Sequence, residues 1–281
     1  MTRLTNFPGN VIIISATALL LLSMVCAKIA TASHRGLRST LPSQDMTISR
    51  ISNYKLVWSD EFAGTSIDTT NWNFQTGGHG WGNHEKEYYQ RENASVTKGN
   101  LVITAKKQHM QSNDYTSVRM TTKGKHDFKY GRMEARIKLP VAQGLWPAFW
   151  MLGANIDSVA WPACGETDIM EHINRDNIVY GTIHWDNNGH VQFGGKTTTT
   201  PADYHVYSVE WDSASIRWSV DGVIYKEASI LDNVNSTEEF HQPFFIILNL
   251  AVGGDWPGQA IDDKSLPAKM YVDYVRVYQQ Q

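Results

Sequence analysis

Cysteine is scarce in this sequence, which has two in 281 residues, Cys26 and Cys164. Cys26 lies in an N-terminal apolar segment that we expect to be removed, so Cys164 would have no partner for an intramolecular disulfide. A chain of this length can bury a sufficient hydrophobic core without such a bond. We therefore expect Cys164 to be a small, buried, apolar side chain.

Metal-binding signatures and an excess of positive charge are also missing. The sequence contains neither an H-E-x-x-H nor a C-x-x-C motif, and we expect its chemistry to require no cofactor. Its 25 basic and 28 acidic residues give a net charge of −3, which becomes −5 when Arg3 and Lys28 leave with the N-terminal segment. This balance argues against nucleic acid and polyanionic substrates as partners and is compatible with a neutral polysaccharide.

The N-terminus differs in character from the rest of the chain. A long apolar run extends over residues 11–27, and Ala30-Thr31-Ala32 offers small residues at the spacing that a signal peptidase needs. We predict a signal peptide over residues 1–32. The alternative is an uncleaved membrane anchor, for which the run is slightly short of the ~20 residues of a membrane span. The protein is thus expected to be secreted, either extracellular or periplasmic, without stable membrane association after cleavage.

The remaining chain is expected to hold one domain. Residues 33–50 are polar and read as a flexible leader, and residues 51–281 show no repeat, low-complexity tract or second linker. We expect this domain to be monomeric.

Strand patterns dominate residues 51–281, and long helical periodicity is absent. Apolar and polar residues alternate over residues 132–139 and 216–220, and the second run is followed by the hairpin signal Asp221-Gly222. Residues 244–252 are nearly all apolar, as in a strand covered on both faces. These patterns predict an all-β protein, an antiparallel two-sheet β-sandwich.

Three carboxylates stand close together in Gly165-Glu166-Thr167-Asp168-Ile169-Met170-Glu171. Glu166 and Asp168 share one face of a strand, whereas Glu171 would point to the opposite face unless one residue after Asp168 bulges out. With that bulge all three acids line one surface, which is the equipment for splitting a glycosidic bond. A solvated edge strand or part of a calcium site would also fit the spacing. The tryptophans upstream, in residues 144–153 and at Trp161, disfavour a solvated edge.

Several motifs in this order make the chain resemble a known family. The E-x-D-x-x-E run, the preceding Gly-Leu-Trp-Pro-Ala-Phe-Trp (144–150), Asn83-His84-Glu85 and the closing residues 272–278 are similar to glycoside hydrolase family 16. Within it they resemble the laminarinase-like endo-β-1,3-glucanases. The similarity covers roughly residues 54 to 278. It implies a concanavalin A-like jelly roll with a cleft across its concave sheet, and makes residues 51–281 a single catalytic domain.

The resemblance implies a role for each acid. Glu166 would be the nucleophile, Glu171 the acid/base, and Asp168 would hydrogen-bond the nucleophile. Carboxyls about 5 to 5.5 Å apart lead to double displacement with retention at the anomeric carbon. Two nearby negative groups raise the pKa of the third, which can keep Glu171 protonated until it is used.

Further residues are expected to bind the polysaccharide substrate. Trp146 and Trp150 resemble the family's subsite tryptophans, and Trp256 lies in a glycine-bounded loop where burial is disfavoured. Asn83 and Arg119 match family positions that hydrogen-bond sugars. His184 resembles a family histidine near the acid/base, although a lone strand histidine can equally be structural.

A structural calcium is the one metal that the resemblance implies. Its ligands would be Glu61, the carbonyl of Gly99, and Asp273, far from the cleft on the convex face. Oxygen donors from separate strands suit calcium. The alternative is that these are simple surface acids.

The leading interpretation is a secreted retaining endo-β-1,3-glucanase. The alternatives within the fold are hydrolases of mixed-linkage β-glucan, agarose or carrageenan. The insertion between Asp168 and Glu171 argues against the family branch with the shorter E-x-D-x-E motif. A non-catalytic glucan-binding module is the alternative from another functional class, and the three intact acids argue against it.

Overall fold

The computed structural model describes residues 53–231 and 235–281 of the chain. The predicted signal peptide and leader lie outside the described residues. Within the part that is described, no helix is both long and apolar enough to cross a membrane.

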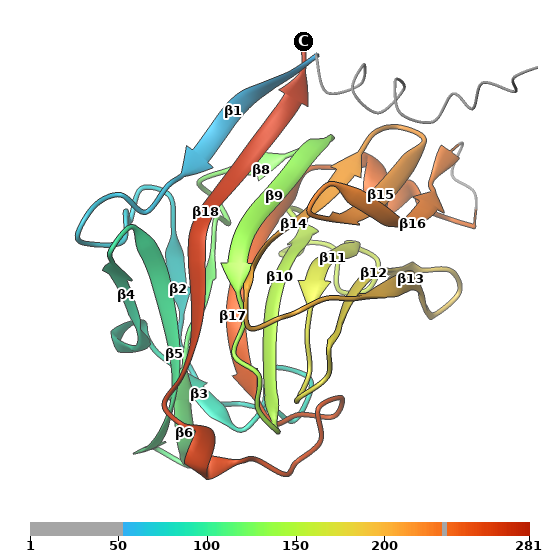
Figure 1. The fold of residues 1–281 in the computed structure, drawn as a ribbon. Helices are drawn as coiled ribbons and strands as arrows, with labels where there is room; N and C mark the ends of the chain where they lie inside the picture. Colours follow the sequence, from blue (N-terminus) through green and yellow to red (C-terminus); the bar gives the residue numbers. More distant parts are fainter. Residues whose placement is uncertain (1–52, 232–234) are drawn as a thin grey trace, which may run out of the picture. The chain divides into compact units, whose positions relative to one another are not determined.

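Most of the described residues belong to two β-sheets (Figure 1). The first sheet has ten strands in the order β16-β15-β14-β9-β18-β5-β6-β3, with β1 on β18 and β4 on β5. Its strands are β1 (Tyr54–Asp60), β3 (Glu87–Tyr89), β4 (Ala94–Thr97), β5 (Asn100–Met110), β6 (Asn113–Ser117), β9 (Gly131–Lys138), β14 (Tyr204–Trp211), β15 (Ser215–Val220), β16 (Val223–Ser229) and β18 (Ala268–Gln280).

The second sheet has eight strands in the order β13-β12-β11-β10-β17-β7-β2, with β8 on β17. They are β2 (Asn73–Gln75), β7 (Arg119–Thr121), β8 (Asp127–Phe128), β10 (Leu145–Gly153), β11 (Glu166–Glu171), β12 (Ile178–Asp186), β13 (His190–Thr198) and β17 (Phe244–Val252). Short 3₁₀ helices are η1 (Arg91–Asn93), η3 (Glu238–His241) and η4 (Asp263–Ser265).

The expectation of an all-β, two-sheet sandwich is confirmed. Among the described residues β3 and β6 pair in parallel and the other strand pairs are antiparallel. The apolar run at residues 244–252 is β17, and all nine of its residues are buried. Asp221 and Gly222 form the predicted turn between β15 and β16 with φ values of 51° and 78°, as a two-residue hairpin requires.

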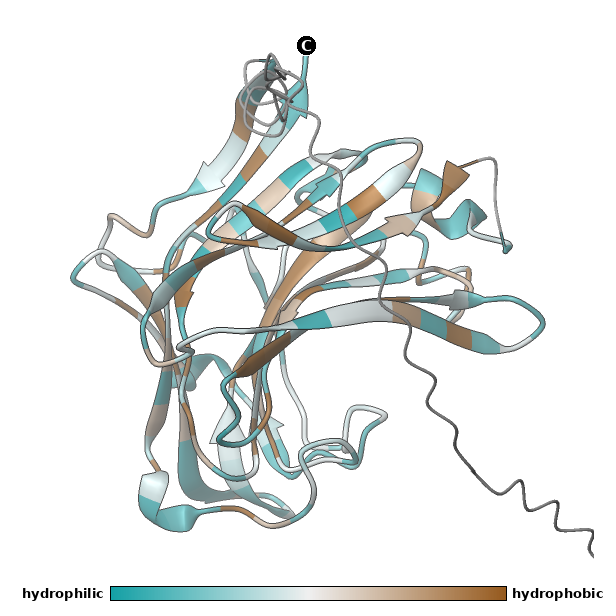
Figure 2. Cartoon of the chain, turned by 45° about the vertical axis from the view of Figure 1, so that its right-hand side comes forward, coloured by the Kyte–Doolittle hydropathy of each residue, from teal (hydrophilic) through white to brown (hydrophobic). Residues whose placement is uncertain are grey.

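The core lies between the two sheets. Apolar residues alternate with polar ones along many strands (Figure 2), because successive side chains point to opposite faces. Trp211 and Trp218 of the first sheet and Phe149 and Phe244 of the second are almost fully buried in one core cluster, where the rings of Trp211 and Phe244 lie edge to face with centroids 5.4 Å apart. Cys164 is buried and free of any disulfide, as expected.

Trp218 connects this core to β11. Its indole Nε1 donates a hydrogen bond of 2.7 Å to the backbone carbonyl of Asp168. The ring reaches that carbonyl because Gly181, on the neighbouring β12, leaves room for it. A Cβ at residue 181 would lie 2.3 Å from Trp218 Cδ1 and 2.6 Å from its Nε1. The position of Asp168 therefore depends on a close approach that glycine permits.

We predict that Gly181→Ala destabilises the fold by about 1–3 kcal/mol, the usual cost of overpacking a core. The methyl group would displace Trp218 and weaken its bond to Asp168. Urea unfolding followed by tryptophan fluorescence measures the loss. Gly64→Ala is the matched control, since a Cβ there meets nothing closer than 3.7 Å. Equal stabilities of the two variants would contradict the prediction.

Candidate active site

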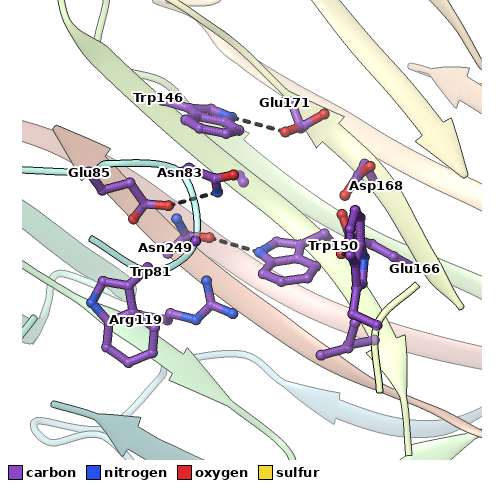
Figure 3. Close-up of a pocket in the computed structure, with 14 residues that line it drawn as sticks. Trp81, Asn83, Glu85, Arg119, Trp146, Trp150, Glu166, Asp168, Glu171 and Asn249 are labelled. Atoms are coloured by element: carbon purple, nitrogen blue, oxygen red, sulfur yellow. Dashed lines mark hydrogen bonds between the residues drawn. The ribbon is translucent and has the colours of Figure 1, made fainter. Parts of the chain in front are cut away.

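The three carboxylates of β11 face the same side of the second sheet. Asp168 pairs with Thr182 of β12, and the next paired residues are Glu171 and Tyr180. Three steps along β11 thus match two steps along β12, and this difference is the predicted one-residue bulge. Figure 3 shows Glu166, Asp168 and Glu171 on one wall of the same cavity.

Each glutamate has its own hydrogen-bond donor. Trp146 Nε1 donates to Glu171 Oε1 at 2.9 Å, and Trp161 Nε1 donates to Glu166 Oε2 at 3.0 Å. Charge-assisted hydrogen bonds of this kind stabilise the ionised form of the acceptor.

His184 of β12 lies beside the other side of this cluster. Its Nε2 is 3.1 Å from Asp168 Oδ2 and 4.0 Å from Glu166 Oε1. His184 was expected near the proposed acid/base, Glu171, whereas the acids that its ring approaches most closely are Asp168 and Glu166.

Burial raises the pKa of all three acids, and repulsion by Asp168 adds to this effect for the two glutamates. Burial is the main cause for Glu166 and the nearby Asp168 the second, and together they raise its pKa to about 8 against the opposing effects of His184 and Arg119. Burial also raises the pKa of Asp168 to about 8. The pKa of Glu171 is raised well above its usual value by burial and then by Asp168. The cluster therefore does not carry three negative charges at neutral pH.

The neighbouring side chains stabilise the anion of Glu166 more than the anion of Glu171. Glu166 has His184, Arg119 and the Trp161 indole to stabilise its anion, whereas for Glu171 the largest opposing effect is the bond from Trp146. Glu171 is thus the carboxyl best placed to keep a proton, and Glu166 the one best placed to lose it. This asymmetry matches the roles of acid and nucleophile that the sequence predicts.

The cavity has a volume of about 400 Å³ and is lined by aromatic and polar side chains. Glu166 and Asp168 line the cavity. Five further residues that were expected to bind substrate or to be catalytic also line it: Asn83, Arg119, Trp146, Trp150 and Glu171. Arg119 lies over the rings of both Trp81 and Trp150, with its Cζ 5.1 Å and 4.7 Å from the ring centroids. These contacts fix the guanidinium at the cavity wall.

Four aromatic or polar residues also line the cavity but were not predicted from the sequence as site residues: Trp81, Glu85, Trp161 and Asn249. Glu85 follows Asn83 in the motif that carried the family resemblance, and Asn249 is a lone amide within the apolar β17. Both were therefore visible as unusual residues in the sequence. Trp81 and Trp161 lie in loops, and their proximity to β11 depends on the folded chain.

A chain of hydrogen bonds crosses the cavity floor (Figure 3). Trp150 Nε1 donates to Asn249 Oδ1 at 2.8 Å, and Asn249 Nδ2 donates to the Tyr89 hydroxyl at 3.2 Å. That hydroxyl donates to Glu85 Oε2 at 2.8 Å, and Asn83 Nδ2 donates to Glu85 Oε1 at 3.1 Å. The orientations of Asn83 and Trp150 are thereby coupled through buried groups.

Trp256 lies at the Glu171 end of the site but outside the cavity lining. It is 40% exposed and meets Trp146 and Tyr180 edge to face, with centroid distances of 5.5 and 4.9 Å. The expectation that this tryptophan is not buried in the core is confirmed.

The residues expected to hold calcium are brought near one another but already have partners. The strand register places Asp60 opposite Val275 and Leu101 opposite Val272, so Glu61, Gly99 and Asp273 lie in one region of the first sheet. Arg276 binds Glu61 through two nitrogens at 2.8 and 2.9 Å, and Arg136 binds Asp273 at 2.8 Å. The acidic charge is thus already balanced by arginine, and calcium binding there stays a prediction.

In the described part of the chain, one group of acids and histidines has ligand atoms within 4.8 Å of one another, namely Glu166, Asp168 and His184. We interpret it as the reactive cluster and not as a metal site, because its two acids face the aromatic cavity that a sugar would fill.

Comparison with known proteins agrees with this geometry. The sequence model described as "Glycosyl hydrolases family 16" matches residues 81–276. A beta-glucanase of Rhodothermus marinus is 42% identical over 247 residues, covering 80% of this chain and 85% of the relative. The crystal structure of the laminarinase catalytic domain from Thermotoga maritima has a TM-score of 0.75 at 44% identity, covering 82% of this chain and 99% of that one.

A further relative is a clotting factor. The clotting factor G alpha subunit of Tachypleus tridentatus is 46% identical over 231 residues, which cover 80% of this chain but 34% of the subunit. The chain thus corresponds to about a third of that relative's length.

The raised pKa values predict how stability depends on pH. Burial and Asp168 raise the pKa of Glu166 from the usual 4.5 to about 8, so the folded cluster that contains Glu166 shares a proton that the unfolded chain has already lost. Between these values the folded state binds more protons than the unfolded state, so stability falls as the pH rises through this window. Glu166→Gln removes this contribution. We therefore expect the thermal midpoint of this variant to be higher than that of the unsubstituted protein at about pH 8 but not at about pH 4.

Differential scanning calorimetry at both pH values checks this expectation. Glu238→Gln is the control, because Glu238 is an exposed acid outside the cavity. A midpoint difference for Glu166→Gln that did not depend on pH would contradict the burial argument.

Proposed function

This chain belongs to glycosyl hydrolase family 16, and on that basis we propose that it is a retaining endo-β-1,3-glucanase. The observation that carries the proposal is the bulged strand β11, which turns Glu166, Asp168 and Glu171 into one aromatic-walled cavity. Residues 1–32 would direct the protein to secretion as a signal peptide.

The proposed reaction has two displacements. In the first, the Glu166 carboxylate attacks the anomeric carbon while Glu171 gives its proton to the departing glycosidic oxygen. This breaks the bond to the leaving chain and leaves a covalent ester on Glu166. The negative charge of Glu166 is then gone, so the pKa of Glu171 falls. In the second displacement Glu171 takes a proton from water, and the water oxygen attacks the anomeric carbon and releases Glu166.

The charges of the cavity support a neutral substrate. Its lining contains four acids, Glu85, Glu166, Asp168 and Glu171, and one basic residue, Arg119. A sulfated polysaccharide such as carrageenan would meet this excess of negative charge. The indoles of Trp81, Trp146, Trp150 and Trp161 offer the flat apolar faces that pack against the C–H side of a sugar ring.

Mixed-linkage β-glucan and agarose are the neutral alternatives to β-1,3-glucan. We expect the protein to release reducing ends faster from laminarin than from lichenan, agarose or carrageenan. Glu171→Gln should lower turnover on laminarin by about 10²- to 10⁴-fold, the usual contribution of a general acid–base group, and Glu166→Gln by at least as much. A reducing-sugar assay with matched protein concentrations measures both effects.

Circular dichroism of the two variants serves as the folding control. Glu166→Gln with near-normal turnover would exclude the assigned nucleophile. Binding of laminarin without any reducing-sugar release by the unsubstituted protein would instead favour a non-catalytic glucan-binding module. Faster release from lichenan or agarose would revise the substrate while leaving the reaction class intact.

Azide rescue distinguishes the roles of the two glutamates. In Glu166→Ala the nucleophile is missing, so azide can enter from the vacated side and yield an α-glycosyl azide from a substrate with an activated leaving group. In Glu171→Ala the covalent intermediate still forms on Glu166, and azide attack on it yields a β-glycosyl azide. Proton NMR of the products reports the anomer. The opposite pairing of variant and anomer would mean that the two roles are exchanged.

A further inference from the structure

His190 stands next to the reactive cluster without touching a carboxylate of β11. It is the first residue of β13 and follows the tight turn Asn187–Gly189. Within this hairpin its Nε2 lies 2.9 Å from Nδ1 of His184, and the two rings are stacked with centroids 5.1 Å apart at an angle of 19°. His184 in turn places its Nε2 3.1 Å from Asp168 Oδ2.

These contacts allow one assignment of hydrogens for a neutral His184. When Asp168 is ionised, its Oδ2 is a negative centre 3.1 Å from His184 Nε2 and repels a lone pair on that nitrogen, so Nε2 then carries the hydrogen. In a neutral imidazole the other nitrogen, Nδ1, is then an acceptor and needs a donor. His190 Nε2 is the group at hydrogen-bond distance from it. A hydrogen bond therefore runs from His190 to His184, while the Nε2–H of His184 lies 3.1 Å from Asp168 Oδ2 without hydrogen-bond geometry and stabilises its charge electrostatically.

His190 also contacts the residue that binds the nucleophile. Its ring centroid is 4.6 Å from that of Trp161, whose indole donates to Glu166 Oε2. Trp161 is 45% exposed and lies in the loop between β10 and β11, so few other groups hold it in place. The His190 ring thus packs against both Trp161, which binds Glu166, and His184, which approaches Asp168.

We propose that His190 is a positioning residue that donates a hydrogen bond to His184 and fixes the tautomer in which His184 presents its Nε2–H to the ionised Asp168. His184 without this donor can place its hydrogen on Nδ1 and present a lone pair to the Asp168 carboxylate, which repels it. The kinetic consequence of this inference rests on the proposed hydrolysis, whereas the tautomer of His184 does not.

Two substitutions separate the hydrogen bond from the packing. His190→Phe keeps a ring against Trp161 and His184 but has no N–H, whereas His190→Gln loses the ring and keeps an N–H donor. We expect His190→Phe to lower kcat on laminarin about tenfold with KM changed less than about twofold, as for loss of a group that orients a reacting partner. Because His190→Gln keeps an N–H donor, we expect its kcat to stay within about threefold of that of the unsubstituted protein.

The tautomer is measured directly on the full protein. A long-range proton–nitrogen NMR spectrum of the imidazole rings should show the hydrogen of His184 on Nε2 in the unsubstituted protein and in His190→Gln. In His190→Phe it should show a population with the hydrogen on Nδ1. His109→Phe is the matched control, because His109 is exposed on β5 of the other sheet and should change neither readout.

Three results would overturn the proposal. They are an Nδ1-protonated His184 in the unsubstituted protein, the same loss of kcat in the Phe and Gln variants, and a rise in KM with unchanged kcat, which would make His190 a substrate contact. Absence of hydrolysis by the unsubstituted protein would refute the proposed function, while the NMR result would still decide the tautomer.

Discussion

The structure depends on placing three carboxylates on one buried face of a single strand. Such a group is costly to desolvate, and its members repel one another. The fold meets that cost with groups from elements other than β11: Trp146 of β10 and Trp161 of the preceding loop donate hydrogen bonds, and the imidazole of His184 on β12 lies 3.1 Å from Asp168 Oδ2. From the core side, Trp218 of the opposite sheet binds the backbone of Asp168 just before the bulge. Trp218 thus fixes the bulge from the core side, while the two indoles and the His184 imidazole stabilise the charges on the cavity side.

The two ends of the cavity are built differently. At the Glu171 end, Trp146 both donates to the acid and packs against Trp256, so the donor is held by aromatic contact. On the side of β17 and β7, the hydrogen-bond chain from Asn83 through Glu85 and Tyr89 to Asn249 and Trp150 runs through buried groups. Because a buried polar group that loses its partner is penalised, such a chain orients all of its members together. A sugar that hydrogen-bonds Asn83 would therefore also depend on the orientation of Trp150, because the two side chains are linked through this chain of hydrogen bonds.

Much of this arrangement could be predicted from the sequence, for identifiable reasons. The apolar run of β17, the alternation of β9 and the Asp221-Gly222 turn are local signals, and the motif spacing required a bulge after Asp168. Asn249 was not assigned to the site because its contact with Tyr89 joins residues 160 positions apart. Trp161 and Glu85 bond residues close to them in the sequence, but both lie in loops whose course the strand patterns do not predict. The arginine partners of Glu61 and Asp273 were missed for the same reason as Asn249, since Arg276 lies 215 residues from Glu61 and Arg136 lies 137 residues from Asp273.

The division of labour between Glu166 and Glu171 follows from these distant contacts and not from β11 itself. Both are glutamates, both are buried, and both lie beside Asp168, so the strand alone would give them similar pKa values. What separates them is that His184, Arg119 and Trp161 all stabilise the Glu166 anion, whereas Glu171 has the Trp146 indole and, as a smaller effect, His184. The strand therefore sets which groups can react, and its surroundings set which of them holds the proton.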